Sequence, residues 1–451
     1  MNSDWQYVLY ICYIFIFMFI AKLLKEKTGL FKSIIVPTAL MAGFIGLILG
    51  PEVIGLFQFD QSFYAPLVSH FMGIGFIGLT LAGSNSKQGN DSVNSGIFIV
   101  TNYVFQGIVG IIIVYILVAT IKPDLFIGLG LMLPLAFGQG PGFASSIGSS
   151  WDLVLPFGYI NQYGLTLATT GFLVGGIVGV ILLNYYVRKY NMPVERLKTL
   201  GGLQNKSITF TNIKEVNFFD TLTVQITFIA VAYALTYLAM SLTITGLGHL
   251  GTIGATIASL VKGFNFLFGI LVALVIKQLL RYLNRRGHRA LELIDNFTMM
   301  NITSFAFSVM ITSSVMAISL QAVKGYWELL LAMSIGGALI TLWFCTWLGR
   351  KVFRINTEHY ILGMFGMMTG TASTGLALLR GVDPNLETDV GKNLVLGSAI
   401  ATPLGLPLMA LLAVPIIGYT EGRPILYLVT LLALIAYEAI LVFIAIYRNR
   451  Q

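Results

Sequence analysis

Charged residues and cysteines are both scarce in this sequence. Only 10% of the 451 residues are Asp, Glu, Lys or Arg, whereas 56% are hydrophobic, and the mean hydropathy is +0.84. This composition lies outside the range of soluble globular domains. Cys12 and Cys345 both fall inside apolar runs, which excludes a disulfide framework and a cysteine-rich metal site. The sequence therefore predicts an all-α polytopic membrane protein.

Catalytic and nucleotide-binding motifs are missing as well. The four histidines are scattered, and there is no HExxH, no GxSxG and no aspartate pair inside an apolar run. The GIGFIG string at 73–78 fits a dinucleotide fingerprint but lies inside an apolar span, so we interpret it as helix packing. The net charge of +8 is explained by Lys and Arg in the loops between spans. We expect neither an enzyme nor a nucleic-acid-binding protein.

Long apolar runs divide the chain into about 11 spans, each near the ~20 residues that a helix needs to cross a bilayer. The first run lacks a basic leader, and we interpret it as a retained span. The expected spans are 6–21, 34–50, 64–83, 96–120, 164–187, 220–243, 263–283, 298–320, 325–348, 393–417 and 424–447.

Two further apolar segments are interrupted by glycine. Segment 125–150 contains FGQGPGFASS, and segment 359–380 contains FGMMTGTAST. Their arms are too short to cross a bilayer, which favours re-entrant hairpins. Aligned without gaps, the two peptides are identical at five of ten positions, and Ser146 faces Thr374. Each hairpin therefore belongs to one copy of a repeat.

The repeat organises the whole chain. Residues 1–187 and 220–420 each hold five spans and one hairpin, residues 188–219 form a cytoplasmic linker, and 421–451 add an extra C-terminal transmembrane helix. Five crossings make the two repeats enter the membrane from opposite sides, so the repeats are inverted. With the N-terminus outside and the C-terminus cytoplasmic, 23 of the 27 Lys and Arg residues lie inside. Segment 244–262 fits either an interfacial loop or part of a longer helix.

The hairpin tips are the candidate binding site. Unwound backbone offers carbonyl oxygens to a cation and N–H groups to a carboxylate. Close helix packing is the alternative for such glycines, and we favour packing for Gly171, Gly175 and Gly179. The expected substrate-binding residues are Gln139, Gly140, Gly142, Ser145, Ser146, Thr369, Gly370, Thr371, Ser373, Thr374 and Arg380. The candidate sodium ligands are Gly138, Ser145, Gly366 and Ser373.

Ionisable residues inside the spans are few. His70 and Glu438 are clearly intramembrane. We interpret His70 as a hydrogen-bonded helix contact, and Glu438 as facing either a neighbouring helix or lipid headgroups rather than as a functional group. Arg380 ends the second hairpin, where its guanidinium either reaches a substrate carboxylate or snorkels to the inner surface. A proton antiporter built on a buried carboxylate pair is therefore not expected.

Three stretches resemble the bacterial sodium/glutamate symporters, relatives of the sodium-coupled citrate carriers. They are the first hairpin GQGPGFASS, the span GLTLATTGFLVGGIVGVILLNYYVRKYN and the closing LLAVPIIGYTE. The resemblance implies a homodimer in the bacterial inner membrane and an elevator-like movement of the hairpin-bearing domain. It also implies Na⁺ as the coupling ion and glutamate, or a similar anionic amino acid, as the small anionic substrate. A carrier of citrate or another carboxylate, and more remotely an ion channel, remain as alternatives.

Overall fold

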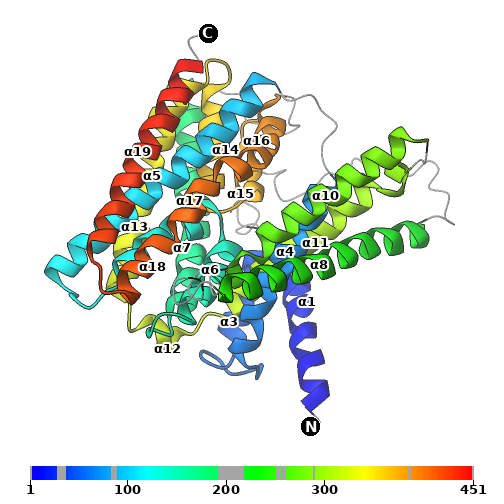
Figure 1. The fold of residues 1–451 in the computed structure, drawn as a ribbon, viewed down its shortest axis with the longest axis horizontal. Coiled ribbons are helices and arrows are strands. Elements are labelled where there is room, and N and C mark those ends of the chain that lie inside the picture. Colours follow the sequence, from blue (N-terminus) through cyan, green and yellow to red (C-terminus); the bar gives the residue numbers. More distant parts are fainter. Residues whose placement is uncertain are drawn as a thin grey trace.

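The computed structural model is built of helices (Figure 1). It describes residues 3–27, 37–82, 89–190, 218–249, 254, 258, 261–287, 290–383 and 388–448, and these contain no β-strand. Nine of the described helices are long and apolar enough to cross a membrane. They are α1 (Ser3–Lys27), α4 (Tyr64–Ala82), α5 (Asn90–Thr120), α7 (Ile160–Tyr190), α8 (Phe218–Gly248), α10 (Asn265–Arg285), α11 (Asn296–Met316), α13 (Trp327–Val352) and α19 (Ile425–Arg448). Such lengths and compositions are those of a polytopic membrane protein.

The expected span 393–417 is bent. Helix α16 (Val390–Leu404) and the following α17 (Leu406–Leu411) and α18 (Ala413–Thr420) meet at an angle of 47° and together form the tenth candidate span. Pro403 lies inside α16, where its ring clashes with the preceding turn and removes a hydrogen-bond donor. The Tyr437 hydroxyl of α19 donates to the Leu404 carbonyl at this bend.

Three sequence expectations fall partly outside the described residues. The span expected at 34–50 corresponds to α3 (Thr38–Leu49), whose 12 described residues are too few to cross a bilayer alone. Residues 191–217 of the predicted linker are not among those described. Of segment 244–262, the structure shows that α8 continues to Gly248, while most of 250–260 is outside the described part.

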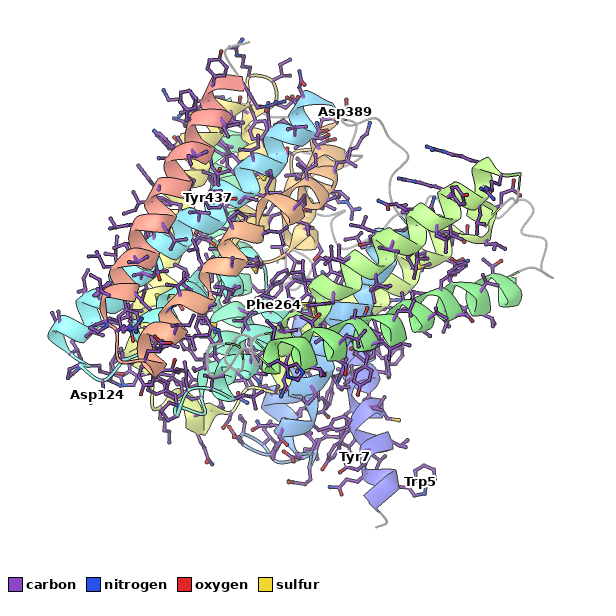
Figure 2. The ribbon with its side chains drawn as sticks, in the orientation of Figure 1. Trp5, Tyr7, Asp124, Phe264, Asp389 and Tyr437 are labelled. Atoms are coloured by element: carbon purple, nitrogen blue, oxygen red, sulfur yellow. The ribbon has the colours of Figure 1, made fainter. Side chains whose placement is uncertain are left out.

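The helices pack as two bundles that lie side by side (Figure 1). The first bundle contains α5, α6 (Pro141–Asp152), α7, α13, α14 (Thr357–Thr369), α15 (Ala372–Leu379) and α16 to α19, which share one hydrophobic core. The second bundle contains α1, α3, α4, α8, α10 and α11. Each bundle therefore combines helices from both halves of the sequence. Asp124 and Asp389 lie at opposite ends of the first bundle, as expected where both ends meet water (Figure 2).

Candidate functional site

The first broken segment unwinds between a π-helical turn and α6. The π-helical turn Pro134–Gly138 ends at the first glycine of the GQGPG motif, and α6 begins at Pro141. Between them, Gly140 adopts φ +87° and ψ −178°, a conformation that residues with a Cβ avoid. Proline suits the first helical position because its φ is already helical and its missing N–H is not needed there. The sequence GQGPG therefore explains both the break and the restart.

The second broken segment unwinds between α14 and α15. Helix α14 ends at Thr369, and α15 begins at Ala372. Between them, Gly370 has φ −151° and ψ −107°, which is neither helical nor extended, and Thr371 is extended. The Thr371 and Ser373 hydroxyls are 2.7 Å apart and hydrogen-bond to each other. The end of one helix and the start of the next therefore both face this short unwound stretch.

The two breaks adjoin each other. A Cβ placed on Gly140 would lie 3.5 Å from the Gly370 carbonyl oxygen. Helix α7 packs behind the second break, where a Cβ on Gly171 would lie 2.6 Å from the Thr369 carbonyl oxygen. The Gln106 amide of α5 donates to the Met368 carbonyl over 2.9 Å. Close contact with the α7 backbone and the hydrogen bond from the buried Gln106 amide of α5 thus hold the second break in place.

The packing interpretation of the α7 glycines is confirmed, and the structure identifies what they contact. A Cβ on Gly175 would lie 2.9 Å from the Thr369 hydroxyl, and one on Gly179 would lie 2.6 Å from Leu378 of α15. The glycines of α7 therefore allow the second broken segment to pack closely against this helix. Any larger residue on this face would push that segment away from the first break.

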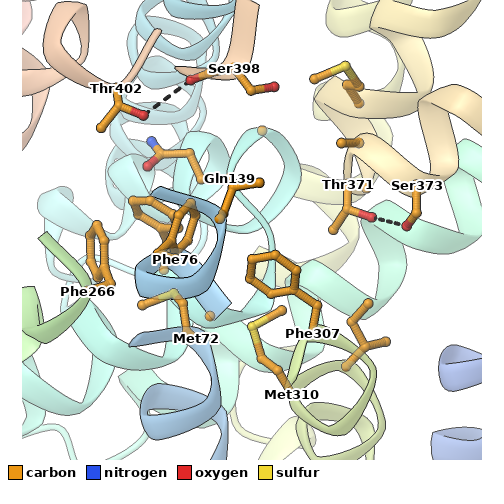
Figure 3. Close-up of a pocket in the computed structure, with 18 of the residues that line it drawn as sticks. Met72, Phe76, Gln139, Phe266, Phe307, Met310, Thr371, Ser373, Ser398 and Thr402 are labelled. Carbon is orange, nitrogen blue, oxygen red and sulfur yellow. Dashed lines mark hydrogen bonds between the residues drawn. The ribbon is translucent and has the colours of Figure 1, made fainter. Parts of the chain in front are cut away.

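A cavity of about 520 Å³ borders the two breaks (Figure 3). The first bundle contributes the breaks, Tyr103 of α5 and the bend between α16 and α17, and the second bundle contributes α3, α4, α10 and α11. The labelled residues in Figure 3 are Met72, Phe76, Gln139, Phe266, Phe307, Met310, Thr371, Ser373, Ser398 and Thr402. The cavity therefore lies between the bundles rather than inside either one.

Six of the predicted site residues line this cavity. They are Gly138, Gln139, Gly142, Gly370, Thr371 and Ser373. Gly140 forms the break itself but is not among the lining residues. Arg380 lies at the far end of α15 with its side chain exposed, and it does not line the cavity. This position agrees with the snorkelling alternative, and contact between Arg380 and a substrate carboxylate stays a prediction.

The remaining predicted residues lie behind the tips. Ser146 hydrogen-bonds Ser69 of α4 over 2.8 Å, and the Thr369 hydroxyl donates to the Phe365 carbonyl. A Cβ on Gly366 would meet the Gly375 backbone at 2.8 Å, so Gly366 has a packing role. These residues shape the broken segments without facing the cavity.

Ser145 and Thr374 carry hydroxyls with an unusual environment. Both side chains are fully buried, and neither hydroxyl has a hydrogen-bond partner in the described structure. Buried polar groups are nearly always paired, because leaving one unpaired costs about 1–3 kcal/mol. Thr374 lies against the second break, since a Cβ on Gly370 would be 2.8 Å from its hydroxyl oxygen. An oxygen in this position, next to unwound backbone, is suited to bind a small cation.

The gapless alignment of the two peptides does not match the positions of the breaks. It pairs Gly142 with Gly370 and Ser145 with Ser373. In the structure, α6 begins directly after Gly140, whereas α15 begins directly after Thr371. Ser373 is consequently at the start of its helix and lines the cavity, while Ser145 lies one turn deeper. The two serines are therefore not equivalent.

Sequence reasoning missed the second-bundle wall of the cavity. Phe76, Phe266 and Phe307 all line it, yet a phenylalanine in an apolar span gives the same signal whether it faces lipid, core or cavity. The bend after α16 had a readable signal, because Pro403 and Gly405 interrupt the span. The cavity is lined there by Ser398 and Thr402.

His70, the GIGFIG string and Glu438 all lie inside membrane-length helices. His70 is a helix contact, with its Nδ1 2.6 Å from the Tyr233 hydroxyl. GIGFIG is a helical stretch whose glycines permit close packing, since a Cβ on Gly75 would lie 2.5 Å from the Phe307 ring. Both predictions are confirmed. Glu438 of α19 is buried, and neither carboxylate oxygen has a partner among the described residues.

Comparison with models of known families, with curated proteins and with solved structures found no match to this chain.

Proposed function

We propose that this chain is a secondary active transporter that carries a small carboxylate together with sodium ions. The observation that carries the proposal is the meeting of two helix breaks, at Gly140 and Gly370, beside a cavity between two bundles. Unwound backbone at membrane depth is tolerated only where protein, water or a bound solute satisfies its polar groups. Broken helices bind ions and solutes in this way in many transporters.

On this proposal, the broken segments are the re-entrant hairpins of two inverted repeats. Both breaks belong to the first bundle, so that bundle is the moving part and the second bundle is the scaffold of an elevator. The resemblance to the sodium/glutamate symporters supports the same division. Most of the scaffold's contribution to the cavity wall is apolar, which suits two surfaces that slide past each other.

Sodium fits the oxygen atoms near the second break. The unpaired Thr374 hydroxyl and the last carbonyls of α14 supply neutral oxygens of the kind that hold Na⁺ at half-helix ends. The Ser145 hydroxyl supplies another at the first segment. Moving one negative charge against an inside-negative potential costs about 2.3 kcal/mol per 100 mV, so co-transported cations are needed to accumulate an anion.

The solute carboxylate would bind at the starts of α6 and α15. Free N–H groups and the positive end of the helix dipole favour an anion there. The resemblance makes glutamate or a similar anionic amino acid the first candidate, with citrate or another carboxylate as the alternative.

Sodium-driven uptake into proteoliposomes tests the proposal. Vesicles holding the purified protein would receive an inward Na⁺ gradient and a panel of labelled carboxylates: glutamate, aspartate, citrate, and monocarboxylates with apolar bodies. We expect saturable, sodium-dependent uptake of at least one compound. Ser373→Trp should abolish it by filling the cavity, whereas Thr227→Trp on the exposed face of α8 should not. Absence of sodium-dependent uptake for every compound would contradict the proposal.

A further inference from the structure

One wall of the cavity is aromatic. Phe76, Phe266 and Phe307 come from three different helices of the second bundle, and Phe143 of α6 joins them. The Phe76 ring is the centre of this cluster, with its centroid 5.6 Å from Phe307, 5.7 Å from Phe143 and 5.9 Å from Phe266. Met72 and Met310 extend the same wall (Figure 3). Such a wall favours an apolar group on the bound molecule.

The cavity also lacks charged side chains. None of the described residues that line it is Asp, Glu, Lys, Arg or His. The break residues offer neutral groups instead, including the Gln139 amide nitrogen, which is buried without a partner, and the Thr371 and Ser373 hydroxyls. Burying a charge without a partner is costly, because the lost hydration is not replaced. The site can therefore compensate one carboxylate at the breaks, but it has no cationic side chain for a second.

We propose that the transported solute has a single carboxylate and an apolar body of aromatic or branched aliphatic size. This inference rests on the proposed transport function and narrows its substrate. The carboxylate binds at the breaks, near Gln139 and the first residues of α15, and the apolar body fills the space against Phe76, Phe266 and Phe307. Glutamate and citrate fit less well, because glutamate would bring one further carboxylate, and citrate two, to the aromatic wall.

The test compares two groups of solutes in the same vesicles. Counterflow of phenylpyruvate and 4-methyl-2-oxopentanoate would be measured beside glutamate and citrate, each with and without sodium. We expect sodium-dependent flux of the apolar monocarboxylates to exceed that of glutamate and citrate at least tenfold. Faster flux of glutamate or citrate would overturn the inference while leaving the transport proposal standing. Sodium-dependent flux of neither group would overturn both.

A pair of variants on α11 links the preference to the aromatic wall. Phe307→Ala should raise the KM for phenylpyruvate at least fivefold, and Phe307→Leu should raise it less. Phe305→Ala is the matched control, because Phe305 is on the same helix but exposed and stacked on Phe15, 5.8 Å away. An unchanged KM in the correctly folded Phe307→Leu and Phe307→Ala proteins would overturn the inference.

Discussion

Replacing Gly140 by alanine is expected to reduce sodium-dependent uptake by one to two orders of magnitude. Gly140 holds φ +87° at the first break, and a side chain there costs about 1–3 kcal/mol of strain, where each 1.4 kcal/mol is a factor of ten. The alanine Cβ would meet only ordinary contacts, at 3.5 Å from the Gly370 carbonyl oxygen and from Thr371. The expected loss of uptake therefore comes from backbone strain, because alanine disfavours the positive φ that Gly140 adopts at the tip. Initial uptake rates and the melting temperature of the purified protein would be measured together.

Gly158→Ala is the matched control for this substitution. Gly158 also has a positive φ, +66°, and a Cβ there would meet nothing within 4 Å. It lies in the loop between α6 and α7, away from the cavity. We expect a comparable loss of stability but near-normal uptake. If both variants transport equally well, the conformation of the first break is not part of the binding site.

Thr374→Val is expected to raise the sodium concentration for half-maximal uptake by about tenfold or more. Valine keeps the shape of threonine and removes a hydroxyl that lies beside the second break and has no partner among the described residues. A hydrogen bond to a charged group contributes about 1.5–3 kcal/mol, and we expect a similar contribution from the contact between this hydroxyl and Na⁺. Loss of the hydroxyl should therefore weaken sodium binding strongly. The melting temperature without sodium should stay the same or rise, because the variant removes an unpaired buried hydroxyl. Uptake would be measured over a sodium titration.

Thr430→Val provides the comparison. Thr430 is equally buried, but its hydroxyl donates to the Leu426 carbonyl within α19, far along the chain from either break. We expect it to leave the sodium dependence unchanged. Equal sodium dependence in Thr374→Val and Thr430→Val would show that Thr374 does not contact the ion.

Much of the helical layout could be predicted from the sequence because apolar length is a strong signal. The run near 325–348 became α13, and the run near 424–447 became α19. The two breaks were also readable, since glycine and proline interrupt the first segment and glycine interrupts the second. Residues 393–417 were expected as a single span, and the bend within it was not predicted, although Pro403 and Gly405 interrupt the run.

The details of the site were less predictable. Identities between the peptides suggested that Ser145 and Ser373 are equivalent. In the structure, however, α6 begins about one turn earlier relative to this alignment than α15 does, so the two serines occupy different positions in their helices. Arg380 seemed close to the tip in sequence, yet α15 carries it to an exposed position. The aromatic wall comes from α4, α10 and α11, and only tertiary packing brings these helices to the breaks.

The most direct test of the central claim is the accessibility of Thr371 from water. Thr371→Cys, in a protein with Cys12→Ser and Cys345→Ser, would be treated in oriented vesicles with a membrane-impermeant maleimide applied to one side at a time. We expect labelling from both sides of the membrane, and a clear slowing of that labelling when sodium and a transported carboxylate are added together. No labelling from either side, or labelling that sodium and solute leave unchanged, would contradict it.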